Sequence, residues 1–471
     1  MPTKTATSAR SRDVSRRDTA ESEARSAPGF DVMGGSLGLR PQDDPGRSSR
    51  GTAPKGIRTR QPGPHASTDN GRVADRVLSP WRFVVWFGIV ALFGDILYEG
   101  ARSITGPLLA SLGASALVVG VVTGVGETAA LLLRLVSGPL ADRSGNFWAW
   151  TVAGYALTVI SVPTLGLTSA LWVACALVIL ERVGKAMRAP AKDTLLSHAT
   201  SVTGRGKGFA VHEVLDQFGA LLGPLLVAGM LLATGGDYAP TLLVLAVPGV
   251  ALMVLVLLLR RRVPDPGAAY EPHARPAPRA RIERVPLPRA FWEFAVFTAL
   301  TMTGFSTFGV LSYHLVQQHL LATAAVPLVY AAAQLVDGAA AVLTGWGYDR
   351  IGPRVLVSLP VVAAAVPALA FTGSAAVAVV GSLAWGAALG IQESTLRATV
   401  ADLVGPVRRA TAYGVFGAVV GGAAAVGGAL SGGLYEVSIP LLVAVTVVIQ
   451  AVALTVLLVN LRRAAPDSTE G

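Results

Sequence analysis

One eight-residue pattern occurs twice in this chain and constrains its fold more than any other feature. The two copies are Gly138-Pro-Leu-Ala-Asp142-Arg143-Ser-Gly145 and Gly345-Trp-Gly-Tyr-Asp349-Arg350-Ile-Gly352. Their aspartates are 207 positions apart, and each copy ends an apolar run long enough to form a helix. A short charged turn between two apolar helices belongs at the boundary between membrane and water, where glycines allow close packing. The pattern therefore predicts a duplicated bundle of membrane helices.

The repeat extends beyond these turns. Glu127 and Gln334 keep the same offset of 207 positions, and the segment from Arg188 to Asp193 is echoed by Arg397 to Asp402 at an offset of 209. Three separate sites agree, which indicates that two halves of the chain share one architecture.

The composition favours a membrane protein over a soluble one. Hydrophobic residues make up 52% of the chain and charged residues only 14%, and most of the charge lies outside the apolar segments. A helix needs roughly 20 apolar residues to cross a bilayer, and residues 83–462 divide into about twelve such segments. The predicted spans are 83–105, 115–140, 147–167, 169–188, 208–234, 239–260, 290–318, 323–345, 354–373, 375–397, 411–434 and 438–461. These runs lack the apolar and polar alternation of a membrane barrel, so we expect an all-α membrane protein with two six-helix bundles related by a parallel repeat.

Basic residues predict the orientation, because Lys and Arg are retained on the cytoplasmic side of a membrane. Alternate junctions between spans are rich in Arg and Lys, whereas the opposite junctions hold none except Arg102 near the end of the first span. We therefore expect a multi-pass protein of the cell (inner) membrane with both termini in the cytoplasm. The same bias explains the net charge of +10, so nucleic acid is not an expected partner, and the lipid bilayer is.

The predicted domains follow from these assignments. Residues 1–79, rich in Arg, Ser, Gly and Pro, predict a disordered basic cytoplasmic tail. Residues 80–262 and 290–463 are the two six-helix bundles. The Pro- and Arg-rich segment 263–289 predicts a cytoplasmic linker, and 464–471 a short cytoplasmic tail.

Sites for other chemistry are absent from the sequence pattern. Cys175 is the single cysteine, and it lies in an apolar span where a thiol is unreactive. No spacing of His, Cys or carboxylates resembles a metal site, and no glycine loop is followed by the Lys and Ser or Thr that hold ATP phosphates. We expect no cofactor, no metal, no catalytic residue and no enzymatic activity.

The residues of the repeated turn resemble the major facilitator superfamily. That family carries Gly-x-Leu-Ala-Asp-Arg-x-Gly between its second and third helices, with a weaker copy in the second half, and the likeness runs from Trp81 to Arg463. Asn146, Phe147 and Trp148 stand where the family usually has basic residues. The resemblance implies that the turn is a conformational latch, closed when the protein faces outward. The residues that it assigns to this latch are Gly138, Asp142, Arg143, Gly145, Gly345, Asp349, Arg350 and Gly352. Alternatively, each turn only solubilises the end of two spans.

A charged stripe in the first span has no counterpart in the second half. Asp95, Tyr98, Glu99 and Arg102 occur at i, i+3, i+4 and i+7, which places them on one helix face, whereas the matching positions hold no charge. Ionisable groups inside a membrane are costly and usually face a wet cavity or a partner. We predict that the stripe carries protons or binds substrate. The alternative is that Glu99 and Arg102 only pair with each other near the outer surface.

Other charges within the spans are further candidates. Glu127 shares a face with Arg134 and is either a proton site or the partner of that arginine. Glu393, in the tenth span, is a candidate cavity residue. In the fifth span, His212, Glu213, Asp216 and Gln217 predict an inner gate. Glu181, Lys185 and Arg188 share a face that suits a charge network. The residues singled out from these and other spans as candidates for an inner gate or charge network are Arg134, Glu181, Arg182, Arg188, Glu213, Asp216, Asp337 and Arg397.

These features favour a secondary transporter that moves a small organic molecule by alternating access, as proton-coupled efflux. An importer or a uniporter of a small metabolite would use similar residues. A non-transporting membrane sensor or assembly partner would bind a ligand without flux. We expect a small-molecule substrate, protons as the coupling ion and a monomer.

Overall fold

The computed structural model describes residues 78–271, 286–405 and 408–464. The described residues form helices and no strands, which confirms the expected all-α fold. The predicted tail lies outside the described residues except for its last two positions, and residues 272–285 of the predicted linker and 465–471 of the C-terminal tail lie outside them too.

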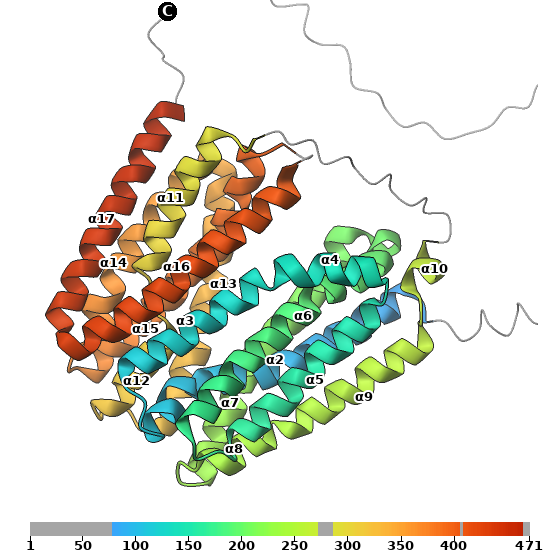
Figure 1. The fold of residues 1–471 in the computed structure, drawn as a ribbon, viewed down its shortest axis with the longest axis horizontal. Coiled ribbons are helices and arrows are strands. Elements are labelled where there is room, and N and C mark those ends of the chain that lie inside the picture. Colours follow the sequence, from blue (N-terminus) through green and yellow to red (C-terminus); the bar gives the residue numbers. More distant parts are fainter. Residues whose placement is uncertain (1–77, 272–285, 406–407, 465–471) are drawn as a thin grey trace, which may run out of the picture. The chain divides into compact units, whose positions relative to one another are not determined.

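The first half contains nine helices of this part of the chain (Figure 1). They are α2 (Pro80–Ser111), α3 (Ala116–Leu132), α4 (Arg134–Ser144), α5 (Phe147–Leu165), α6 (Leu171–Thr203), α7 (Arg205–Ala233), α8 (Tyr238–Val244), α9 (Ala246–Arg262) and α10 (Pro266–Tyr270). The second half follows the same order of long helices. It contains α11 (Arg289–Thr303), α12 (Phe308–Gln317), η1 (Thr323–Ala325), α13 (Val326–Ile351), η2 (Gly352–Val357), α14 (Ser358–Ala370), α15 (Ala375–Leu403), α16 (Arg409–Val437) and α17 (Ile439–Ala464).

Ten stretches of the described residues are long and apolar enough to span a membrane. One of them, Thr323–Ala370, contains both α13 and α14. The 33-residue helix α6 is not among the ten, because its charged side chains begin at Glu181 and continue to Asp193. The chain is therefore a multi-pass membrane protein, and helix-length segments stand at all twelve predicted positions.

Several predicted spans differ from the helices at those positions. The first was expected to end at residue 105 and the fourth at 188, but α2 continues to Ser111 and α6 to Thr203. Charged residues do not end these two helices, because their side chains pack against neighbouring helices. The span predicted at 290–318 is broken between Thr303 and Phe308, where the Thr307 side chain caps α12 by accepting a bond from the Val310 amide.

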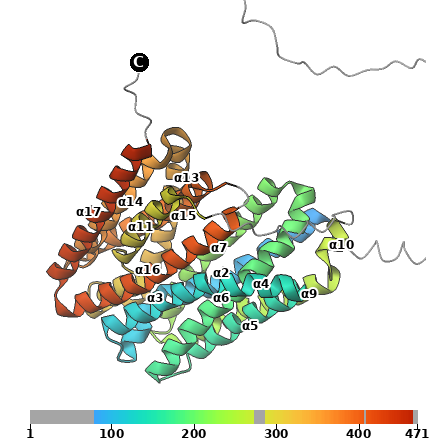
Figure 2. The same cartoon turned by 45° about the horizontal axis from the view of Figure 1, so that its top comes forward.

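The two halves pack against each other at one end of the helices. We call the end at which α4 and α9 finish and α11 begins the linker side, and the other end the far side. In Figures 1 and 2, α4 and α10 lie apart from the linker-side ends of α11 and α17, whereas α3 crosses α16 closely. A Cβ added at Gly120 would overlap the carbonyl oxygen of Gly428, and one at Gly106 would overlap that of Gly309. Glycine is therefore required for these backbones to approach.

The start of the segment predicted as a linker is folded against the first half. The Tyr270 hydroxyl donates to the Leu78 carbonyl at 2.9 Å, and Trp148 Nε1 donates to the Val263 carbonyl at 3.1 Å. His198 Nδ1 lies 3.1 Å from a Glu271 carboxylate oxygen. Burial raises the pKa of Tyr270 to about 12. Residues 263–271 thus form a clasp over the ends of α2, α5 and α6.

Candidate substrate cavity

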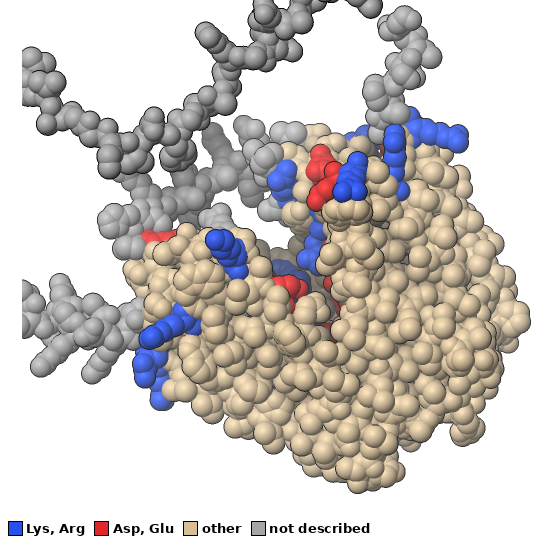
Figure 3. All heavy atoms as spheres, turned by 180° about the vertical axis from the view of Figure 1, so that it is seen from behind, with Lys and Arg blue, Asp and Glu red and all other residues tan. Residues whose placement is uncertain are grey.

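A cavity of about 610 Å³ lies between the two halves. Its walls come from α2, α3, α4 and α6 of the first half and from α11, α12, α15 and α16 of the second. Figure 3 shows a hollow between two lobes of the protein, with acidic and basic side chains in its walls. A volume of this size suits a small organic molecule.

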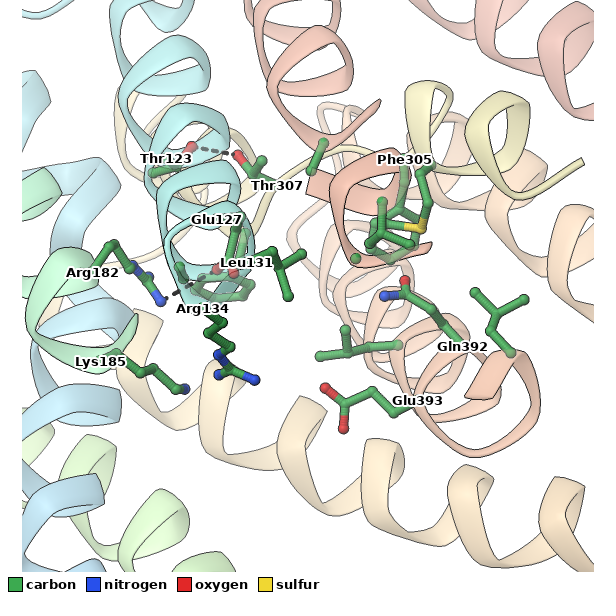
Figure 4. Close-up of a pocket in the computed structure, with 18 of the residues that line it drawn as sticks. Thr123, Glu127, Leu131, Arg134, Arg182, Lys185, Phe305, Thr307, Gln392 and Glu393 are labelled. Carbon is green, nitrogen blue, oxygen red and sulfur yellow. Dashed lines mark hydrogen bonds and ion pairs between the residues drawn. The ribbon is translucent and has the colours of Figure 1, made fainter. Parts of the chain in front are cut away.

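The far end of the cavity is closed by contacts between the halves. The hydroxyls of Thr123 and Thr307 lie 2.9 Å apart (Figure 4), and Gly106 packs against Gly309 beyond them. The other end is lined by residues near the linker-side ends of their helices, among them Arg397 and Tyr413. The cavity therefore opens toward the linker side.

A chain of ion pairs follows the wall formed by the first half. Glu127 Oε1 lies 3.0 Å from Arg102 and 3.3 Å from Arg182. Arg182 also lies 3.4 Å from Glu181, and Arg102 lies 3.7 Å from Glu99. These side chains come from α2, α3 and α6, and the ion pairs hold the three helices together.

This chain of charges reaches the second half through one hydrogen bond. The Tyr330 hydroxyl of α13 donates to Glu99 Oε2 of α2 at 2.5 Å, and both side chains are buried. Tyr330 also packs edge-on against Phe308. This hydrogen bond therefore links a carboxylate of the first half to an aromatic side chain of the second.

Three further basic side chains line the cavity without a carboxylate within 4 Å in the described part of the chain. They are Arg134, Lys185 and Arg397. Lys185 Nζ lies 3.7 Å from the centre of the Tyr98 ring, a cation–π contact. In Figure 4, Lys185 and Arg134 lie on one side of the open space and Glu393 lies across it.

The wall formed by the second half is aromatic. Trp385 stacks on Phe305 at 6.2 Å between ring centres and lies 5.3 Å from the Phe308 ring. Its indole nitrogen donates to the Ser306 carbonyl at 2.9 Å, which fixes the orientation of the ring. This wall offers a flat apolar surface for part of a ligand.

Comparison with known proteins places this geometry in a family. The family model of the Major Facilitator Superfamily matches residues 83–428 and 326–471. The chain belongs to the major facilitator superfamily. It is 60% identical over 399 residues to an uncharacterized protein of Mycobacterium tuberculosis, covering 83% of this chain and 96% of that one. It is 24% identical over 372 residues to an uncharacterized MFS-type transporter of Methanocaldococcus jannaschii, covering 77% and 90%.

Solved transporter structures share the fold. The nucleoside transporter NupG superposes with a TM-score of 0.63 at 14% identity, covering 81% of this chain and 98% of that one. A POT family transporter in complex with 5-aminolevulinic acid gives 0.67 at 14% identity, covering 84% and 100%. A bacterial homologue of the human lysosomal transporter Spinster, in an inward-facing and unoccupied conformation, gives 0.62 at 16% identity, covering 81% and 97%. The chain is thus a transporter of the superfamily, and these likenesses concern its fold.

Half of the residues predicted for coupling, substrate or gating line the cavity. They are Tyr98, Arg102, Glu127, Arg134, Arg182, Glu393 and Arg397. The others lie outside its lining. Asp95 instead makes a side-chain hydrogen bond with Asp216 inside the first half, Glu213 is exposed, and Asp337 is buried with one carboxylate oxygen unpartnered among the described residues.

Three of the sequence-based pairings differ from the contacts. Glu127 does not pair with Arg134, because the helix breaks at Leu133 between them and two other arginines reach the carboxylate. Arg188 donates to the Thr158 hydroxyl at 2.9 Å, and among the described residues it forms no ion pair with Glu181. The side chains proposed as a gate in the fifth span do not face one way, since His212 is buried near Phe87 and Gln217 is exposed.

The two turns of the superfamily motif lie at the linker side. Gly145 and Gly352 end their helices with φ of 60° and 62°, a conformation that glycine adopts at little cost. Asp142, Arg143 and Asp349 are exposed, with no ion pair or side-chain hydrogen bond within the described ranges. Arg350 lies over the Trp346 ring at 3.5 Å. Gly138 lies beside Pro190 of α6, and Gly345 has open space around it.

Several lining residues were missed as site residues at the sequence level. Lys185 was treated as part of an internal network, although it lies one helical turn from Arg182 and so shares its face. Phe305 and Thr307 were hidden in a span read as continuous. Gly304 followed by Thr307 is a helix stop and start signal that could have revealed the break.

Proposed function

We propose that this protein is a proton-coupled secondary transporter that exports a small organic molecule by alternating access. The observation that carries the proposal is the cavity between the halves, closed at the far side and open at the linker side. Two six-helix bundles around one central site can rock to open either side in turn.

The positive-inside pattern supports a cytoplasmic position for the linker side. The cavity then faces the cytoplasm in this structure, with both termini on the same side of the cell (inner) membrane. Such a state is one of the two that alternating access requires. The exposed and unpaired Asp142 and Arg143 fit it, because the latch implied for this turn is closed only in the outward-facing state.

Buried carboxyl groups support coupling to protons. Asp95 and Asp216 are two carboxyl groups close together in the first half, and such a pair can share a proton. Glu99 is buried between Arg102 and the Tyr330 hydroxyl. A proton arriving at Glu99 would remove its charge and weaken its ion pair with Arg102, which lines the cavity. The freed arginine could then contact a substrate in the cavity, so the protonation of Glu99 and the occupancy of the cavity would be linked through Arg102.

The test uses purified protein in liposomes that enclose a pH dye, with substrates screened for triggered proton movement. Glu99→Gln should abolish proton movement while leaving substrate binding measurable, because the amide keeps an acceptor for Tyr330 but cannot titrate. Glu293→Gln is the matched control, since Glu293 pairs with Arg289 and Arg463 at the surface. Unchanged proton movement in Glu99→Gln would remove Glu99 from the coupling. Flux without proton movement in the parent protein would overturn coupling altogether, and inward movement of substrate against its gradient would overturn export.

A further inference from the structure

The charges around the cavity are unequal. Five basic and two acidic side chains line it. Glu127 already contacts both Arg102 and Arg182, so these two arginines are largely satisfied. Glu393 is the other carboxylate of the lining, and it lies within electrostatic range of Lys185 and Arg397. Behind the lining, Asp193 attracts Arg134, and Glu99 and Asp95 attract Lys185. The wall therefore carries more positive charge than its own carboxylates neutralise.

The excess charge lies at one end of the cavity. α15 carries both Arg397, near the linker side, and Trp385, twelve residues deeper, which is a rise of about 18 Å along a helix. Arg134 lies near enough to Arg397 for the two charges to repel each other. Phe305 and Phe308 stand with Trp385 at the deep end. The cavity thus has a basic mouth and an aromatic floor.

We propose that the substrate is an amphipathic organic anion, with a carboxylate or phosphate group held at the mouth and an apolar body on the aromatic floor. Guanidinium groups bind carboxylates and phosphates through paired hydrogen bonds, and an ammonium group adds a point charge. The anion would relieve the repulsion between Arg134 and Arg397. Trp385 and Phe305 would cover the flat apolar part of the ligand. The inference rests on the proposed transport function only in treating the bound molecule as cargo.

Binding to detergent-purified protein, measured by titration calorimetry, tests this inference without any transport. The probes share one apolar body and differ in charge: 3-phenylpropanoate, neutral 3-phenylpropanamide and cationic 3-phenylpropylamine, with phenyl phosphate to compare the two anionic groups. We expect the anion to bind at least about tenfold more tightly than the amide, and the amine to bind most weakly.

Variants locate the site. Lys185→Gln and Arg397→Gln should each weaken binding of the anion by roughly ten- to a hundredfold, with little effect on binding of the amide. Lys185→Arg should retain most of the affinity. Arg354→Gln is the matched control, because Arg354 is exposed in η2 and does not line the cavity.

Equal binding of anion and amide, tighter binding of the amine, or equal losses of all probes in the variants would each overturn the proposal. Failure of transport is separable from failure of this inference. Charge-selective binding without flux in liposomes would leave the anion site standing and refute transport. Flux of neutral or cationic compounds without anion binding would support transport and refute the anion site.

Discussion

A single methyl group at the crossing of α3 and α16 should shift the balance between the two states of the transporter. In Gly120→Ala the new Cβ would overlap the Gly428 carbonyl oxygen and lie 3.3 Å from the Gly432 Cα. These atoms are backbone, so neither can rotate away. Overpacking of this kind costs about 1–3 kcal/mol, and the cost applies only to the state in which the far side is closed. The ratio of the two states should therefore change by about 5–150-fold.

Gly229→Ala is the matched control, because a Cβ at Gly229 has nothing within 4 Å. Both variants gain the same helix propensity on replacing glycine, roughly 0.5–1 kcal/mol, so their difference isolates the clash. Gly120→Leu adds a larger side chain at the same place and should shift the ratio further.

Spin labels on the linker side measure the ratio. Cys175 is the single cysteine, so Cys175→Ser gives a background in which Lys207 and Arg354, both exposed, can be replaced by labelled cysteines. If the far side is driven open, the linker side should close and the distance between the labels should shorten. A distance distribution in Gly120→Leu that matches Gly229→Ala would refute the reasoning, because the closed far side would then not depend on this crossing.

The remaining predictions concern the latch and the clasp. Asp142→Asn should slow substrate counterflow in liposomes by weakening the outward-facing state, with an unchanged melting temperature, because Asp142 is exposed here without an ion pair; normal flux at normal expression would remove it from the mechanism. Tyr270→Phe should lower the free energy of unfolding by about 0.5–1.5 kcal/mol, since the bond to the Leu78 carbonyl is lost, and an unchanged denaturant midpoint would contradict this. Burial raises the pKa of Tyr270 from its ordinary value of 10 to about 12. Its contribution is therefore complete below pH 10 and is lost as the pH rises from 10 to 12, so the stability of the parent protein, but not that of Tyr270→Phe, should include this decline.

The fold could be predicted because its signals are local or repeated. Apolar length gives each span, and the doubled Gly-Asp-Arg-Gly turn gives the relation between the halves. Span ends were less predictable, because a charged residue ends a span only if its side chain faces water. Lys192 does not end its helix, since α6 continues past it to Thr203. Whether a charge faces water or a neighbouring helix depends on packing, which one sequence does not contain.

Several residues of the candidate site could be predicted from the sequence, but the contacts between them could not. Helical spacing placed Tyr98 and Arg102 on one face, and both line the cavity. The same spacing could not show that Glu127 of α3 would meet Arg102 of α2 and Arg182 of α6, because that depends on how three helices cross. Asp95 and Glu99 differ by one helical turn, yet their partners lie on α7 and α13 respectively. Helical spacing predicts which residues share a face, but the packing of the helices determines which residues they contact.

The contacts that join the halves differ in how they would respond to a proton. The crossings of Gly120 with Gly428 and of Gly106 with Gly309 are packed backbone, so protonation changes nothing there. The bond from Tyr330 to Glu99 ends on a titratable group that also pairs with Arg102. Rocking of one half against the other must strain or break this bond, because the two residues lie on opposite halves. If protons drive the cycle, the protonation state of Glu99 affects the strength of this bond, and the bond in turn affects the movement of one bundle against the other. Tyr330→Phe should then loosen coupling without removing the titrating group, whereas Glu99→Gln removes the group and leaves an acceptor.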